Sequence, residues 1–301
     1  MWCRSCRIAG CSTGIITASP CANIWALRHN TEPTRALRSD VNNYRQAHIH
    51  RKDMDMKIGI IGAGNIGATI AKKLAGAGHT VKLAGSKGPE DIREKAEEIG
   101  TIPVAAEDAV KDVEAIILSI PFAQIPNIAG LFAHLPADVV VIDTGNYYPF
   151  RDGNIAVIDE GKPESVWSSE QLGRPVIKAF NALLAETLTN GGTPEGTVNR
   201  IAIPVAGDDA RGKAIASKLV NETGFDALDA GDLANSWRQQ PGTPAYCTEL
   251  ALPELRDALS KANQASAPKN RDVLIKSFME ETSPLSHGQI VARNREVTAP
   301  K

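Results

Sequence analysis

Short apolar runs alternate with stretches of helical periodicity from residue 57 onward. Six of these runs have the length and the aliphatic content of strands that are buried on both faces. Helical stretches fall between most of them, so the pattern predicts a parallel sheet covered by helices on both sides, an α/β fold. The expected strands span residues 57–61, 80–84, 102–104, 115–119, 139–143 and 175–179.

The clearest helix signal covers residues 65–77. Ile66, Ile70 and Leu74 recur every four residues and therefore share one face, and Gly78 follows where glycine often ends a helix. Pro89 is well placed to begin the next helix, because proline fits the first helical turn.

A smaller unit of the same kind follows the sixth strand. We expect a strand at residues 200–206, a helix at 209–222 with Asp208 as its N-cap, and a strand at 225–228.

The segment after residue 250 favours helices, at 254–263 and 272–279. It is too polar to form a core of its own, so this tail is expected to pack onto the body or onto a second subunit.

Residues 1–55 differ from the remainder of the chain. They hold four of the five cysteines, and Met54 and Met56 stand directly before the first expected strand. We interpret this segment as an over-extended start or a leader, largely disordered. Cys3 and Cys6 have the spacing of half a zinc site, but no second close pair completes it, so no metal is expected. Three further segments follow, at 56–182, 183–250 and 251–301.

Composition narrows the choice of partners. The 301 residues carry a formal net charge of −2, and no apolar run reaches the roughly 20 residues of a membrane helix. Neither nucleic acid nor a membrane is expected as a partner, and a small molecule fits better. The core lacks paired cysteines, which makes the cytoplasm the default location.

A glycine pattern stands where the first strand turns into the first helix. Gly62, Gly64 and Gly67 form G-x-G-x-x-G, in which the first glycine allows a tight turn, the second lets a pyrophosphate approach and the third lets helix and strand pack closely. This placement predicts a Rossmann doubly wound sheet that binds a dinucleotide, with a small C-terminal α/β unit and a helical tail. The loop residues expected to line the dinucleotide are Gly62, Ala63, Gly64, Asn65, Ile66 and Gly67.

Cofactor choice is decided about 20 residues further on, at the end of the second strand. No carboxylate stands there, whereas Ser86 can donate a hydrogen bond to a 2′-phosphate and Lys87 can neutralise it. The prediction is NADP(H); the alternative is that both residues belong to a solvated loop.

Two more strand ends lie on the ligand-binding edge of such a sheet. Ser119, Ile120 and Pro121 are expected along the nicotinamide ribose, and Asn146 beside the ring. Phe122 and Tyr147 are candidates for contact with a substrate. These strand ends could also be ordinary strand-to-helix turns, an alternative that is about as well supported for Tyr147 and Tyr148.

The chain resembles the NADP oxidoreductase family that works with the deazaflavin coenzyme F420. The resemblance rests on the glycine pattern, on Gly85-Ser86-Lys87 and on the segments 119–122, 204–209 and 228–233. The segment 176–181 is also similar to the NADPH domain of six-transmembrane ferric reductases. The resemblance implies a hydride passing between nicotinamide and a stacked deazaflavin or flavin-type ring, with Asn181 orienting the carboxamide or the acceptor. Members of this family are often dimers, so a homodimer is one expected assembly. The sequence identifies no catalytic acid or base.

The chain departs from that family in having Phe180-Asn181 in place of a Leu-His pair, an added loop at 147–173 and the tail. Two other functions therefore stay open. One is a pyrroline-5-carboxylate-type imine reductase, whose long helical dimerisation domain is missing here. The other is a non-catalytic NADPH-sensing module that signals through the tail.

Overall fold

A computed structural model describes residues 55–299, and the expectations for residues 1–54 lie outside this range. The contacts within the chain group residues 54–301 into one compact unit, so the segments that begin at 183 and 251 are parts of that unit. No helix of the described range is long and apolar enough to cross a membrane.

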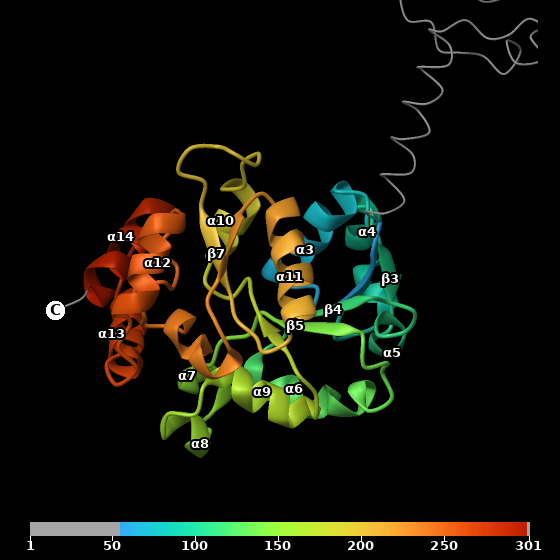
Figure 1. The fold of residues 1–301 in the computed structure, drawn as a ribbon, viewed down its shortest axis with the longest axis horizontal. Helices are drawn as coiled ribbons and strands as arrows, with labels where there is room; N and C mark the ends of the chain where they lie inside the picture. The colour runs from blue at the N-terminus through green and yellow to red at the C-terminus, as the bar shows by residue number, and fades with distance from the viewer. Residues whose placement is uncertain (1–54, 300–301) are drawn as a thin grey trace, which may run out of the picture. The chain divides into compact units, whose positions relative to one another are not determined.

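The central sheet has six parallel strands in the order β3-β2-β1-β4-β5-β6 (Figure 1). This is the strand order of a Rossmann fold, and the order reverses between β1 and β4, where ligands bind. The bounds are β1 Lys57–Ile61, β2 Thr80–Ala84, β3 Ile102–Val104, β4 Ala115–Leu118, β5 Val140–Asp143 and β6 Ile177–Lys178.

Helices cover both faces of the sheet. Figure 1 shows α3 (Asn65–Gly76) and α11 (Ala210–Glu222) on one side, and α6 (Ile125–Ile128) and α9 (Glu164–Leu172) on the other. Alternate strand residues supply two separate apolar clusters, one beneath each layer, so Ile117 packs with the first pair of helices and Ile116 with the second. Shorter elements complete the two layers: α4 Pro89–Glu98, α5 Ala106–Ala109, η1 Phe122–Gln124, η2 Ala129–Phe132, α7 Pro149–Asp152, α8 Ala156–Asp159 and α10 Ala185–Asn190.

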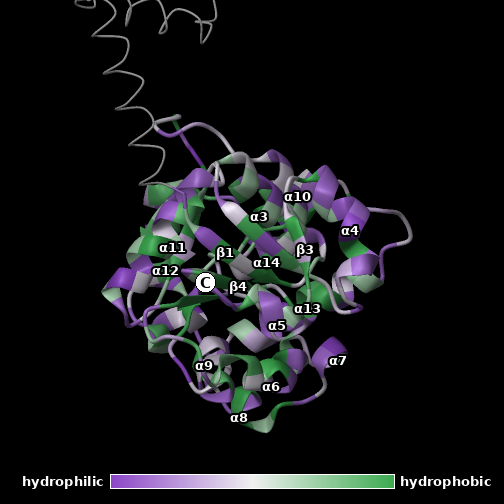
Figure 2. Ribbon diagram, turned by 90° about the vertical axis from the view of Figure 1, so that its right-hand side faces the viewer, coloured by the Kyte–Doolittle hydropathy of each residue, from purple (hydrophilic) through white to green (hydrophobic). Residues whose placement is uncertain are grey.

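Surface helices follow the expected amphipathic pattern. Helix α4 buries only Ile92 and Ala96, and Figure 2 shows most of it in the hydrophilic colour. Its first turn carries Glu90 and Asp91, which complement the helix dipole.

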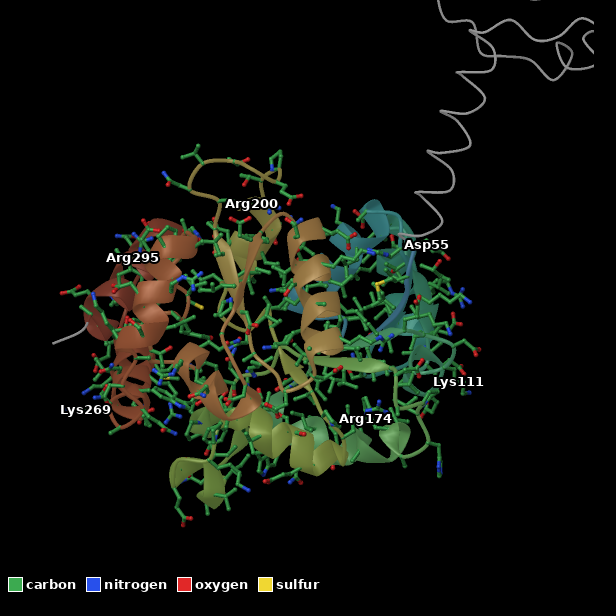
Figure 3. All side chains as sticks on the ribbon, in the orientation of Figure 1. Asp55, Lys111, Arg174, Arg200, Lys269 and Arg295 are labelled. Atoms are coloured by element: carbon green, nitrogen blue, oxygen red, sulfur yellow. The ribbon has the colours of Figure 1, made fainter. Side chains whose placement is uncertain are left out.

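The smaller unit consists of β7 (Ala202–Val205), α11 and β8 (Asp226–Asp229), with β7 and β8 parallel. It joins the main sheet through an antiparallel bridge between Lys178 and Ala206. Arg200, labelled in Figure 3, fixes the loop before β7, because its guanidinium donates to the Thr193 and Gly224 carbonyl oxygens at 3.0 and 3.2 Å.

One expectation for this unit is wrong. The N-cap of α11 is Asp209, whose carboxylate accepts from the backbone N–H groups of Arg211 and Gly212. Asp208 instead accepts from the backbone N–H of Leu233 at 2.9 Å, so it holds the chain beyond β8. Either aspartate suits a cap in the sequence, and only the tertiary contact separates them.

The tail folds back onto the body. Helix α12 (Leu252–Lys261) buries Leu255 and Leu259 against the β7 and β8 unit and against η3 (Leu233–Gln239). Helix α13 (Ala267–Met279) packs on α14 (His287–Thr298), which the sequence did not predict. The buried residues of α14 are Val291, Asn294 and Thr298, so its apolar stripe is too thin to show in the pattern.

Candidate functional site

The glycine turn after β1 has the geometry that the spacing predicted. Gly62 has a φ of 116°, and a Cβ added there would lie 2.0 Å from the Ser119 carbonyl oxygen. A Cβ on Gly67 would lie 1.9 Å from the carbonyl oxygen of Gly62, so helix and turn approach as closely as the backbone allows. Gly64, in contrast, faces open space, with nothing within 4 Å of its added Cβ. The position that should admit a pyrophosphate is therefore the open one.

The first turn of α3 leaves its backbone N–H groups available. The N-cap position is Gly64, no side chain caps the helix, and Gly64 and Asn65 are exposed. Lys95 of α4 donates to the carbonyl oxygen of Ala63 at 2.9 Å and so ties the loop to the next helix. These residues fit the diphosphate of a dinucleotide.

The end of β2 lies next to this loop, because Gly62 donates to the carbonyl oxygen of Ala84 at 2.9 Å. Ser86 and Lys87 follow on an exposed turn. The Lys87 ammonium lies 3.9 Å from the carboxylate of Asp91, and its side chain stays 77% exposed, so it is free to reach a phosphate.

The end of β4 lies on the other side of the loop. Ser119 donates to the carbonyl oxygen of Ile61 at 2.8 Å, and Thr144 after β5 donates to that of Leu118 at 3.1 Å. Ser119 and Ile120 are half-buried and Pro121 is exposed, so the structure brings the three segments to one edge of the sheet.

Phe122 and Tyr147, the predicted substrate contacts, lie in the core. Both are fully buried; the Phe122 ring stacks on Trp167 with centroids 4.8 Å apart. The Tyr147 hydroxyl accepts from the backbone N–H of Ile155 at 3.0 Å and donates to Asp159 at 3.1 Å. The structural alternative therefore replaces the prediction for these two side chains, because no ligand reaches them without opening the core.

Asn146 and Asn181 face each other at the carboxyl edge. Asn146 Nδ2 donates to the backbone oxygen of Asn181, and Asn181 Nδ2 donates to Asn146 Oδ1, both at 3.0 Å. Asn181 also exchanges hydrogen bonds with Gln239, whose Nε2 lies 2.9 Å from Asn181 Oδ1. Asn181 is 2% exposed and both N–H groups of its amide are used, so its side chain holds Asn146 in place. The contact of Asn181 with the acceptor stays a prediction.

Two tyrosines continue this network toward the tail. The hydroxyls of Tyr148 and Tyr246 lie 2.6 Å apart, and Asn146 Nδ2 lies 3.4 Å from the Tyr246 hydroxyl. Burial raises the pKa of Tyr148 well above its usual value, which keeps the phenol protonated. Gln239 and Tyr246 belong to the polar and aromatic stretch at 238–247, which is the sequence signal that could have pointed to them.

A buried ion pair lies beneath Asn146. Lys178 of β6 lies 3.2 Å from the carboxylate of Asp143 at the end of β5, and both side chains are at most 1% exposed. Lys178 also donates to the carbonyl oxygen of Gly145, while Asp143 accepts from the Gly145 N–H at 2.8 Å and from Ser165 at 3.0 Å. The turn that carries Asn146 is therefore held at both its N–H and its C=O.

Glu164 at the start of α9 is a second buried carboxyl, 3% exposed. Its Oε2 has no hydrogen-bond partner among the described residues. Burial raises its pKa to about 7, against the opposing effect of Lys178. Neither Lys178 nor Glu164 was singled out in the sequence.

The described residues hold no group of three or more histidine, cysteine or carboxylate side chains suited to a metal. Cys247 is buried, and burial raises its pKa to about 12, so it is a neutral thiol.

Comparison with known proteins identifies the family of the chain. The family described as NADP oxidoreductase, coenzyme F420-dependent, matches residues 57–147. A putative protein of Escherichia coli (strain K12), YjhV, is 34% identical over 127 residues, which cover 42% of this chain and 85% of that protein. The chain belongs to the F420-dependent NADP oxidoreductase family.

Two further proteins are similar to the chain. The metalloreductase STEAP3 of Rattus norvegicus is 27% identical over 190 residues, which cover 60% of this chain and only 35% of the metalloreductase. The solved structure of a hypothetical protein, SMa0349, from Sinorhizobium meliloti superposes with a TM-score of 0.57 at 25% identity, over 68% of this chain and 98% of that one. As a family member the chain is an NADP-dependent oxidoreductase.

The glycine turn yields a matched pair of variants. Gly64→Ala leaves the free energy of unfolding within about 1 kcal/mol of wild type, because the added methyl meets open space and the lower entropy of the unfolded chain offsets the poorer N-cap, but it raises the Kd of NADPH at least tenfold. Gly67→Ala destabilises the fold by about 1 to 3 kcal/mol, because the methyl meets backbone. Urea unfolding and fluorescence titration with NADPH measure both quantities. Unchanged NADPH affinity in Gly64→Ala contradicts the placement of the pyrophosphate.

Glu164 makes stability depend on pH. Its pKa is raised from 4.5 to about 7, so between these values the folded chain binds more protons than the unfolded chain. The free energy of unfolding therefore falls as the pH rises through this interval, by a contribution on the order of 3 kcal/mol, and changes little above it. Glu164→Gln should flatten the decline in urea unfolding between pH 5 and 8. Glu160→Gln, which alters an exposed carboxyl, should keep it; equal slopes in all three proteins refute the assignment.

Proposed function

We propose that this oxidoreductase passes a hydride between NADP(H) and a flat acceptor ring of the deazaflavin or flavin type. The observation that carries the proposal is the composition of the carboxyl edge around Asn146. Carboxamides, phenols and backbone groups meet there, and the histidines of the described residues lie elsewhere, at positions 79, 134 and 287. Such an edge suits a reaction that depends on positioning more than on acid-base groups.

Asn146 is the residue we assign to the nicotinamide end. Its Oδ1 accepts one hydrogen bond from Asn181, and a carbonyl oxygen can accept two, so one lone pair stays available for the carboxamide N–H of the cofactor. Lys178 and Asp143 hold the turn beneath it. When NADPH is bound, it supplies the hydride, and these residues keep the ring from rotating away from its acceptor.

NADPH rather than NADH is the proposed coenzyme, because no carboxylate occupies the end of β2 and Lys87 is exposed beside Ser86. Coenzyme F420 and flavins are the proposed acceptors, in line with the coenzyme in the family's description. We also propose that the protein is cytoplasmic and forms a homodimer.

The two alternatives differ from it in measurable ways. A pyrroline-5-carboxylate-type imine reductase must give a proton to nitrogen, for which the Tyr148 and Tyr246 hydroxyls are the nearest donors. An NADPH-sensing module needs a tail that can leave the body, whereas α12 buries Leu255 and Leu259 against it. The packing of α12 therefore counts against the sensor, and turnover with each substrate separates the two reductases.

Ser86 and Lys87 should set coenzyme preference. Replacing both with alanine removes the donor and the charge that face a 2′-phosphate, so the Kd of NADPH rises at least tenfold while that of NADH stays within twofold. Titration of intrinsic fluorescence with each coenzyme gives both constants. A parallel loss of affinity for the two coenzymes shows that the turn does not read the 2′-phosphate.

Turnover tests the reaction itself. NADPH oxidation, followed by its absorbance, should be stimulated by at least one of coenzyme F420, FMN, FAD and riboflavin. Asn146→Ala should lower kcat at least tenfold with a smaller change in the Kd of NADPH, because the nicotinamide loses its orientation. Pyrroline-5-carboxylate serves as the competing substrate. Stimulation by it alone establishes the imine reductase, and tight NADPH binding without any turnover favours the sensor.

A further inference from the structure

A groove of about 500 Å3 lies between the loop after β5 and the tail helix α13. Tyr148, Pro149 and Phe150 form one wall, and Ile275 and Met279 are the apolar residues of the other. Phe150 is 61% exposed and Met279 66%, although both are large apolar side chains. A volume of this size is in the usual range of small-molecule sites, about 300 to 1,000 Å3.

We infer that this groove holds the ring system of the acceptor, with the tail forming one side of the site. The inference rests on the proposed function and deepens it, because it makes the tail a determinant of which ring is accepted.

The shape of the walls favours a flat ring. The ring centres of Tyr148 and Phe150 lie 5.7 Å apart, and the two rings are tilted by 53° to each other. The guanidinium carbon of Arg151 lies 5.2 Å from the centre of the Tyr148 ring. The opposite wall offers an aliphatic side chain and a thioether, which pack well on aromatic faces. A planar heteroaromatic ring between these walls gains stacking on one face and apolar contact on the other.

The charges around the groove are already paired. Arg271 lies 2.8 Å from Asp272, and Lys276 lies 3.7 Å from Glu280. Arg271 also lies 5.7 Å from the centre of the Tyr147 ring, and its side chain is only 11% exposed. Because the lining has no surplus charge, it suits an uncharged ring better than a polyanion. The charged substituents of such a molecule would stay in solvent.

Tyr148 connects the groove to the coenzyme edge. It lines the groove, and its hydroxyl lies 2.6 Å from that of Tyr246, which in turn lies 3.4 Å from Asn146 Nδ2. Reduction of the ring takes a hydride from NADPH, which becomes NADP+, and one proton from water.

The test uses the full chain with riboflavin as the probe ring. Met279→Glu places a carboxylate in the groove, and Val273→Glu places one on the same helix about 120° away, where the exposed Val273 is not part of the lining. We expect Met279→Glu to raise the Kd and the KM of riboflavin at least tenfold with the Kd of NADPH unchanged. Val273→Glu should change none of these values. Phe150→Ser, at an equally exposed position, should repeat the loss.

Three results overturn the inference. Riboflavin turnover that is equal in wild type and in the groove variants places the acceptor elsewhere, while the proposed function stands. A loss of NADPH affinity in Met279→Glu shows a general disturbance of the site. A change of oligomeric state in the groove variants, with riboflavin binding intact, shows that a second copy covers this face. Conversely, groove-dependent riboflavin binding without any NADPH oxidation keeps the site and removes the proposed reaction.

Discussion

The buried pair of Asp143 and Lys178 is the interaction on which the carboxyl edge of the sheet depends. Two charges that are almost fully withdrawn from water cost several kcal/mol each to bury, and the mutual attraction offsets this only when further hydrogen bonds are made. Those bonds come from Ser165 and from both backbone groups of Gly145. The pair thus joins β5, β6 and α9 and fixes the turn between Asp143 and Asn146. Removing either partner would leave a charge in the core.

This arrangement fixes the position of Asn146. Its backbone follows the fixed turn, and its side chain is held by Asn181, which is itself held by Gln239. Phe180, just before Asn181, has a φ of 61°, a conformation that a bulky residue rarely adopts. Backbone strain of this kind persists where the surrounding structure determines it and is often found at functional sites. Here the network that requires it presents one amide oxygen at the coenzyme edge.

Local patterns in the sequence were sufficient for β1, β2 and β3, whose bounds agree with the prediction at every residue. β6 is shorter than expected. Its residue Lys178 exchanges backbone hydrogen bonds with Ala206, which directly follows β7, so the chain pairs with the smaller unit at this point. The same residue shows why the ion pair was missed: a lysine within an apolar strand gives no sign of a partner 35 positions away. The Asn181 and Gln239 bond spans 58 positions and is equally invisible to periodicity. Phe122 and Tyr147 were misplaced for the opposite reason, because position along the chain does not reveal which way an aromatic ring points.

One residue of the tail, Arg271, contacts both the groove beside α13 and the residues beneath the carboxyl edge. Arg271 of α13 lines the groove, lies against the ring of Tyr147, and is among the charged groups that act on Glu164, together with Lys178 and Asp143. Glu164 also influences Tyr148, on the groove wall. Since these groups interact in a buried setting where water screens little, the pKa of Glu164 depends both on the ion pair under Asn146 and on Arg271 of the tail. A polar tail that the sequence presents as an appendage is therefore, in three dimensions, part of the electrostatic surroundings in which a hydride would be transferred.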